Sequence, residues 1–203
     1  MKGIILAGDK GNRLHPLTLG TPKQLLPIFD KPMIFYPIET SAEVGVTDIL
    51  IITSPQQTSA FVNTLGDGSQ FGVRFTYATQ VNPEGVTQAF TIGEEFLEKE
   101  SVCFITGYCV ILGDDRANKL RKTIRAAKNC GQATIFVSKD YDPDQYGVVK
   151  LDAKGKCAKV EGKATDRFHY SITGFYVFPK GVANYAKVIA KSERIRLEVT
   201  TLN

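Results

Sequence analysis

The sequence predicts an α/β protein with three layers, in which helices cover both faces of a mostly parallel, mixed sheet. Apolar runs rich in β-branched residues alternate with longer amphipathic stretches over residues 2–106. These runs are almost continuously hydrophobic, which is typical of strands buried on both faces. After about residue 132 short strands follow one another, so the second part is predicted to be β-rich.

The elements of the first part follow in a regular order. Strands are predicted at KGIILA (2–7), DILIIT (48–53), RFTYAT (74–79) and SVCFIT (101–106). Helices are expected between them, within residues 30–45, 54–67 and 85–100.

Two helix starts carry capping signals. Ser54 followed by Pro55 places an N-cap and a first helical residue before the second helix. Asp114 or Asp115 can cap a helix over residues 116–129, which is expected to end near Gly131.

The second part is predicted to contain the strands 133–139, 146–152, 157–163 and 171–178, followed by a helix opened by Pro179. The segment LDAKGKCAK carries an Asp-to-Gly turn of the hairpin type. No linker separates residues 1–131 from 132–203, so one domain of residues 1–203 is expected, whose two parts share a sheet or pack directly.

Composition limits the classes of partner. The net charge is only +4, from 25 basic and 21 acidic residues, and no run of like charges marks a nucleic-acid arm, so small anionic ligands are expected. No segment is long and apolar enough for a membrane span, and the N-terminus does not resemble a signal peptide. The four cysteines lack metal-ligand spacing, which favours reduced thiols in a cytoplasmic protein, with Cys103 in the core.

The loop after the first strand, LAGDKGNR, is the first candidate site. Gly8 and Gly11 let the backbone approach an anion closely, while Lys10 and Arg13 add positive charge. The glycine spacing matches neither common phosphate-binding motif, so an ordinary strand-to-helix turn is the alternative. Asp9 stands among these donors and would repel a phosphate, with Lys10 able to offset part of its charge.

The longer stretch LAGDKGNRLHPLTLGTPKQLLPIFDKPMIFYPI resembles the opening of the sugar-1-phosphate nucleotidyltransferases, glucose-1-phosphate thymidylyltransferase in particular. LGDGSQFGVRFTYATQ, GVTQAFTIGEEF, YGVV, ITGFYVF and LEVT extend the resemblance along the whole chain. It implies a Rossmann-like nucleotidyltransferase fold, with a nucleotide-binding part in residues 1–131 and a sugar-phosphate part in 132–203. It also implies that dTTP and glucose 1-phosphate react to give dTDP-glucose and pyrophosphate, with Mg²⁺ and basic residues offsetting the charge.

The resemblance implies roles for individual residues. Nucleotide binding falls to Leu6, Gly8, Gly11, Arg13, Gln80 and Gly85. Sugar-phosphate binding falls to Gly147, Glu161, Lys163, Ile172 and Tyr176. Arg13, Lys23 and Lys163 take catalytic roles on the phosphates. The plainer alternatives are surface positions for the two lysines and a core position for Tyr176.

This sequence departs from the family pattern at the metal positions. The aspartate of the L-G-D-N motif is replaced by Tyr108, and the aspartate of E-I-T-D-V-N by Thr201. A phenol and a hydroxyl stay neutral near pH 7 and are poor ligands for Mg²⁺, so no metal-binding residue is assigned and Mg²⁺ binding is expected to be weak or absent. Asp114 follows too late to replace the first aspartate and is expected to cap a helix.

Three further departures from the family pattern also favour a degenerate relative of the family. The second glycine of the loop has become Asp9, and the acidic residue expected before Lys163 has become Gly162. The later helices of the family would follow Asn203, so the C-terminus is expected to be short.

Three functions therefore stay open. The first is a degenerate relative that binds dTTP, dTDP-glucose or glucose 1-phosphate with little or no turnover. The second is an active Mg²⁺-dependent transferase, and the third is a non-catalytic regulatory or interaction subunit. A homo-oligomer is expected by resemblance in each case, with neither a nucleic-acid nor a membrane partner.

Overall fold

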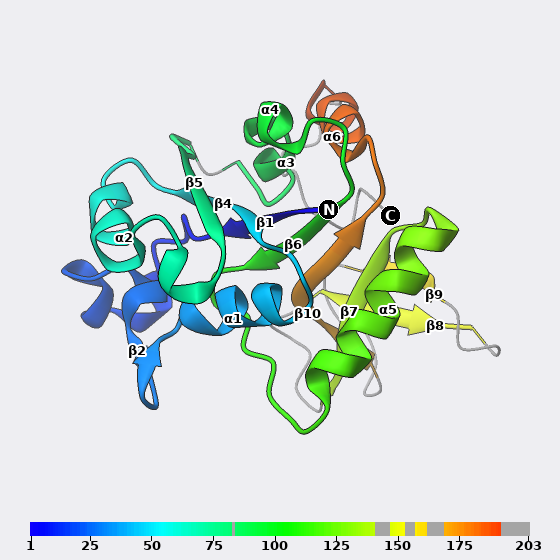
Figure 1. Cartoon of the computed structure of the whole chain (residues 1–203), viewed down its shortest axis with the longest axis horizontal. Coiled ribbons are helices and arrows are strands. Elements are labelled where there is room, and N and C mark those ends of the chain that lie inside the picture. Colours follow the sequence, from blue (N-terminus) through cyan, green and yellow to red (C-terminus); the bar gives the residue numbers. More distant parts are fainter. Residues whose placement is uncertain (83, 141–146, 153–156, 162–168, 192–203) are drawn as a thin grey trace.

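The computed structural model describes residues 1–82, 84–140, 147–152, 157–161 and 169–191. Its central feature is a sheet in which the strands β5 (Arg74–Thr79), β4 (Asp48–Thr53), β1 (Lys2–Leu6) and β6 (Val102–Thr106) run parallel, in that order (Figure 1). These are the strands that the apolar runs predict.

The second part continues the same sheet. Strand β10 (His169–Phe178) pairs antiparallel with β6 and with the strands β7 (Thr134–Asp140) and β8 (Val148–Leu151). Strand β9 (Cys157–Glu161) pairs antiparallel with β8, as a hairpin requires, although residues 153–156 of the predicted Asp-to-Gly turn lie outside the described residues. The sheet is therefore mixed, and the β-rich second part is confirmed.

Helices cover both faces of the sheet and give three layers (Figure 1). One core lies between the sheet and the helices α1 (Phe35–Glu43), α2 (Thr58–Leu65) and α5 (Arg116–Cys130), and it includes Ile5 of β1. The other core lies beneath α3 (Gln88–Ile92), α4 (Glu94–Leu97) and α6 (Val182–Lys191), and it includes Ile4. Successive strand residues thus serve opposite faces, which explains the continuous apolar runs.

Short elements complete the first part. The loop after β1 leads into the 3-10 helices η1 (Asn12–Leu14), η2 (Leu17–Leu19) and η3 (Lys23–Leu25), and the strands β2 (Pro27–Ile28) and β3 (Lys31–Pro32) form a small hairpin. A fourth 3-10 helix, η4 (Ser69–Phe71), precedes β5.

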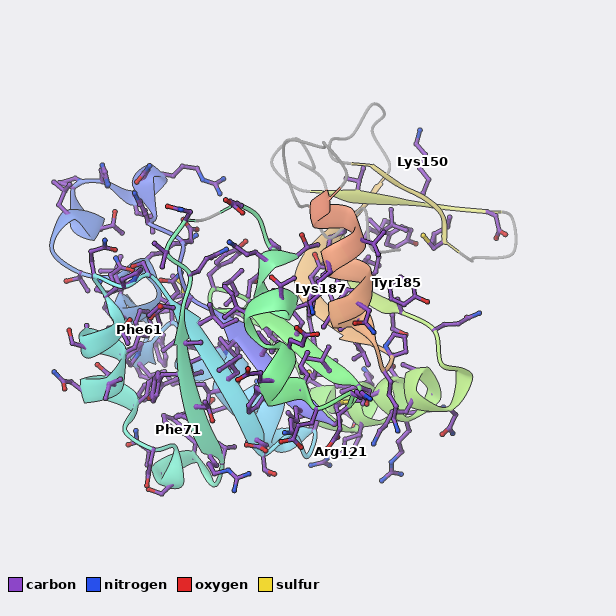
Figure 2. The ribbon with its side chains drawn as sticks, turned by 90° about the horizontal axis from the view of Figure 1, so that it is seen from above. Phe61, Phe71, Arg121, Lys150, Tyr185 and Lys187 are labelled. Carbon is purple, nitrogen blue, oxygen red and sulfur yellow. The ribbon has the colours of Figure 1, made fainter. Side chains whose placement is uncertain are left out.

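Helix α6 docks on the sheet through one face. Val182 and Ala186 are buried, and the Lys187 Nζ donates to the Glu94 carboxylate of α4 at 2.6 Å. Figure 2 shows Tyr185 and Lys187 on this helix. Pro179 precedes the helix by three residues, so the predicted opening at Pro179 is wrong by nearly one turn.

The helix-start predictions at Ser54 and Asp115 need correction. Helix α2 begins at Thr58 instead of Pro55, because the Gln57 N–H and the Thr58 hydroxyl both donate to the Ser54 carbonyl and form a separate turn. Asp115 does occupy the N-cap of α5, and Gly131 ends that helix, but the Asp115 side chain caps no backbone N–H. It accepts a hydrogen bond from the Asn118 amide at 2.6 Å instead.

Three cysteines are described as free thiols. Cys103 and Cys109 are buried and Cys157 is exposed, so the predicted core position of Cys103 is confirmed. Burial raises the pKa of Cys109 to about 12, which makes this thiol unreactive near neutral pH. No helix within the described ranges is both long and apolar enough to cross a bilayer.

Candidate nucleotide site

A pocket of about 270 Å³ opens where the parallel strands end, and we call it the β1–β6 pocket. Its lining residues are Leu6, Gly8, Asp9, Gln80, Gly85, Val86, Thr106 and Tyr108. Leu6 and Thr106 are the last residues of β1 and β6. Ligands of open parallel sheets bind beyond these carboxyl ends, so the position agrees with the predicted site.

The pocket brings together four residues that the sequence assigned to nucleotide binding: Leu6, Gly8, Gln80 and Gly85. The Gln80 amide is held in place, because its Nε2 donates to the Gly85 carbonyl at 3.2 Å and to the Gln88 Oε1 at 2.6 Å. A Cβ at Gly8 would lie 3.2 Å from the Gln80 Oε1, so glycine allows the loop to approach this amide. A fixed amide beside apolar walls can recognise the polar edge of a base.

Gly11 shapes the loop without lining the pocket. Its φ of +67° lies in the left-handed region, and a Cβ there would lie 2.8 Å from the Lys23 Cβ. The Thr18 hydroxyl donates to the Gly11 carbonyl at 2.8 Å. This packing places η3, and with it Lys23, directly against the loop.

The Asp9 carboxylate occupies the donors of this loop. Its Oδ1 accepts from the Gly11 N–H at 2.9 Å, and its Oδ2 accepts from the Lys23 Nζ at 3.0 Å. The sequence named Lys10 as the cation that offsets Asp9, but the ion-pair partner in the structure is Lys23. Burial opposes the charge of Asp9, yet the Gly11 N–H, Lys23 and the charge of Arg13 outweigh it and lower its pKa.

Tyr108 completes this group on the other side of Lys23. The Lys23 Nζ lies 4.0 Å from the centre of the Tyr108 ring, which is a cation–π distance. Tyr108 is 41% exposed and lines the β1–β6 pocket. Desolvation and the Asp9 carboxylate raise the pKa of Tyr108, so the phenol stays neutral near pH 7.

These side chains do not fit a Mg²⁺ ion. Proteins usually anchor magnesium through one or two carboxylates, whereas here the Asp9 carboxylate is held by Lys23 and the Tyr108 phenol is neutral. Within the part of the chain that the structure describes, no group of three or more His, Cys, Asp or Glu side chains is placed to hold a metal. Thr201, at the second expected metal position, lies outside the described residues.

The other predicted residues that the structure describes do not belong to the lining of the β1–β6 pocket. Arg13 lies in η1 and is exposed, and its charge acts on Asp9. Gly147 and Ile172 are brought together, because the Ile172 N–H donates to the Gly147 carbonyl at 2.9 Å. The backbone of Glu161 lies opposite Val148 in the β8–β9 ladder, and Lys163 lies outside the described residues.

Tyr176 packs in the protein interior. It is only 7% exposed, its ring stacks on Phe178 with centres 5.8 Å apart, and it also contacts Phe104. Tyr176 does not belong to the lining of the β1–β6 pocket. The surroundings of Tyr176 are those of a core residue, which was the plainer alternative, and its role toward a sugar phosphate stays a prediction.

Two polar residues were missed by sequence reasoning. Gln24 is completely buried, and neither atom of its amide has a hydrogen-bond partner. A Cβ at Gly107 would lie 3.1 Å from the Gln24 Cγ, so this amide lies beneath the segment that carries Tyr108. Thr106, which lines the pocket, has a buried hydroxyl. Gln24 and Thr106 are polar residues within the apolar motifs KQLLP and FITG, and this contrast could have identified them.

Comparison with known proteins identifies the family of this chain. The family model described as Nucleotidyl transferase matches residues 2–203. The glucose-1-phosphate thymidylyltransferase of Neisseria gonorrhoeae is 43% identical over 204 residues, covering 100% of this chain and 70% of the relative. The enzyme of the same name from Mycolicibacterium smegmatis is 42% identical over 204 residues, covering 100% of this chain and 69% of the relative.

Solved structures agree with the sequence relatives. A Bacillus anthracis protein assigned as a glucose-1-phosphate thymidylyltransferase, crystallised with sucrose, superposes with a TM-score of 0.86 at 31% identity, covering 100% of this chain and 81% of that one. A UDP-glucose pyrophosphorylase with UDP-glucose superposes with a TM-score of 0.81 at 19% identity, covering 99% of this chain and 84% of that one, which supports the fold alone. The match of the family model to residues 2–203 and the identity of 42–43% to the Neisseria gonorrhoeae and Mycolicibacterium smegmatis relatives show that this chain belongs to the nucleotidyl transferase family.

Proposed function

We propose that this chain binds a thymidine nucleotide or nucleotide sugar in the β1–β6 pocket and transfers nucleotidyl groups weakly or not at all. Binding is supported by the convergence of Leu6, Gly8, Gln80 and Gly85 on one pocket. The relatives named glucose-1-phosphate thymidylyltransferase point to dTTP, dTDP-glucose and glucose 1-phosphate as the ligands to try.

The proposal of weak turnover is supported by the contacts that join Asp9, Lys23 and Tyr108. Attack by a sugar phosphate on a nucleoside triphosphate crowds negative charge at the α-phosphorus, and catalysis depends on cations that neutralise it. In this chain the Lys23 ammonium is committed to the Asp9 carboxylate and to the Tyr108 ring. The Lys23 ammonium therefore neutralises a protein carboxylate instead of a reacting phosphate.

A direct assay of product tests this proposal. We expect dTDP-glucose to form from dTTP and glucose 1-phosphate, with Mg²⁺ present, at least about 100-fold more slowly than with the Neisseria gonorrhoeae relative, the size of effect known for one lost electrostatic contact. Calorimetry on the same preparation is expected to detect binding of at least one of the three ligands. A rate within about tenfold of the relative would overturn the proposal.

An active thymidylyltransferase is the second candidate, and the 43% identity along the whole chain is the observation that favours it. A restoration variant separates the two. The triple change Tyr108→Asp, Thr201→Asp and Asp9→Gly is expected to gain Mg²⁺-dependent dTTP binding if the unusual residues are the cause of low turnover. The control Asp30→Asn alters an exposed carboxylate in the β2–β3 turn and is expected to leave dTTP binding unchanged.

A further inference from the structure

The β1–β6 pocket has an unusual charge for a phosphate site. Among the described residues that line it, Asp9 is the one charged side chain, and the others are aliphatic, hydroxyl, amide or glycine. A triphosphate that entered this pocket would lie close to the Asp9 carboxylate, and no described lining residue would supply a positive charge. Like charges a few ångströms apart repel appreciably even near a protein surface.

The Lys23 ammonium and the Gly11 N–H both contact Asp9. Lys23 is only 14% exposed, is ion-paired with Asp9 at 3.0 Å and covers the Tyr108 ring. The Gly11 N–H, the kind of donor that would serve a phosphate oxygen, is given to the same carboxylate at 2.9 Å. A triphosphate could accept from the Gly11 N–H only after displacing Asp9, and at Lys23 it would share an ammonium whose charge Asp9 already offsets.

Asp9 retains acceptor capacity toward the pocket. An ionised carboxylate can accept about four hydrogen bonds, and Asp9 uses one oxygen for Gly11 and the other for Lys23. Its side chain is 43% exposed and lines the pocket. A sugar hydroxyl can donate to these lone pairs, whereas an ionised phosphate oxygen cannot.

The size of the pocket agrees with a small ligand. Its volume of about 270 Å³ lies just below the range of roughly 300–1,000 Å³ that is usual for drug-sized ligands. The Gln80 amide and the apolar side chains of Leu6 and Val86 can receive a flat base, with Asp9 on the same wall as Gly8. Base and sugar can thus be accommodated without a phosphate group.

We propose that the β1–β6 pocket binds an uncharged nucleoside in preference to its triphosphate, with the Gln80 amide on the base and the Asp9 carboxylate accepting from a sugar hydroxyl. This inference rests on the proposed function, because it takes the pocket to be the site for the nucleoside end of a nucleotide. In this proposal the Asp9 carboxylate occupies the position that a phosphate of the ligand would otherwise take.

The test compares thymidine with dTTP by calorimetry at one fixed ionic strength, without and with Mg²⁺. We expect thymidine to bind the wild-type chain at least about tenfold more tightly than dTTP. In the variant Asp9→Asn, dTTP is expected to bind about tenfold more tightly than in wild type, whereas thymidine is expected to bind at least about threefold more weakly, because its sugar hydroxyl loses the charged acceptor. Asparagine keeps an oxygen for the Gly11 N–H, and a thermal melt verifies that the variant is folded.

The control variant Asp30→Asn removes a carboxylate outside the pocket and is expected to alter neither affinity. Tighter binding of dTTP than of thymidine by the wild type would overturn this inference and leave the proposed function standing. An unchanged dTTP affinity in a folded Asp9→Asn variant would overturn the role of Asp9. Absence of binding by thymidine, dTTP and dTDP-glucose alike would overturn the proposed function and this inference together.

Discussion

Asp9 is the residue at which this chain differs most clearly from the phosphate-binding loop that its sequence resembles. Its carboxylate lies between the Gly11 N–H and the Lys23 ammonium, two donors that would otherwise face an anionic ligand. The loop is thereby stabilised from within. The same contact links η3 to β1, because Lys23 begins η3 and Asp9 follows the end of β1.

The stability contributed by Asp9 depends on pH. The folded-state pKa of Asp9 lies below its ordinary value of 3.8, so its contribution is fully present above the ordinary value and is lost as the pH falls through the lowered pKa. We expect Asp9→Asn to lower the free energy of unfolding at about pH 7, and the difference from wild type to shrink toward about pH 3. Denaturant unfolding at both pH values, monitored by circular dichroism, measures this difference.

Asp30→Asn is the matched control, because Asp30 is exposed in the β2–β3 turn. A difference between Asp9→Asn and wild type that is independent of pH would mean that Asp9 acts through its shape instead of its charge.

The residues of the pocket were predictable to different extents. Leu6, Gly8, Gln80 and Gly85 belong to long motifs, and the structure gathers them because β1 and β5 lie in one parallel sheet. The contact of Lys23 with the Tyr108 ring joins segments far apart in the sequence. A motif shows which types of residue are present, but only the packing of η3 against the end of β6 brings these two side chains together.

At the scale of elements, the segment 85–100 shows how packing overrides a continuous helical pattern. The structure divides it into α3 and α4 at Gly93, whose N–H donates to the Ala89 carbonyl at 2.9 Å. A Cβ at Gly93 would lie 2.9 Å from the Ile4 Cδ1 and 3.1 Å from the Leu50 Cδ2. Glycine therefore lets this helical segment approach the sheet closely.

We expect Gly93→Ala to lower the free energy of unfolding by roughly 1–3 kcal/mol, because the added methyl group must displace core side chains. Denaturant unfolding measures the change. Gly20→Ala is the control, since a Cβ at Gly20 meets nothing within 4 Å, and a change below about 0.5 kcal/mol is expected there. A Gly93→Ala variant as stable as wild type would show that the core relaxes around the methyl group.

At the scale of the whole molecule, strand β10 unites the two parts of the chain. It pairs with β6 of the first part and with β7 and β8 of the second. Phe178 of β10 packs edge-on against Phe90 of α3, with ring centres 5.1 Å apart, and stacks on Tyr176. A shared sheet and a shared core predict that both parts unfold together.

We expect Phe178→Ala to lower the free energy of unfolding by about 3–5 kcal/mol, since Phe178 is 1% exposed and its removal leaves a cavity. Far-ultraviolet circular dichroism and tyrosine fluorescence are expected to report one coincident transition. Phe29→Ala is the matched control, because Phe29 is 97% exposed and its loss is expected to change stability little. Two separated transitions in wild type would instead mean that the parts fold independently.

The sequence by itself determined the class of fold, the order of the strands along the chain and the family, because hydrophobic runs and long motifs are local properties of a chain. It also identified Asp9 and Tyr108 as unusual residues. Only the tertiary structure decided that Lys23 pairs with Asp9 and lies over Tyr108, that Tyr176 packs with Phe104 and Phe178, and that Gly93 interrupts a helix. These facts depend on distances between segments remote in sequence, which the packing of the layers sets and no local pattern encodes.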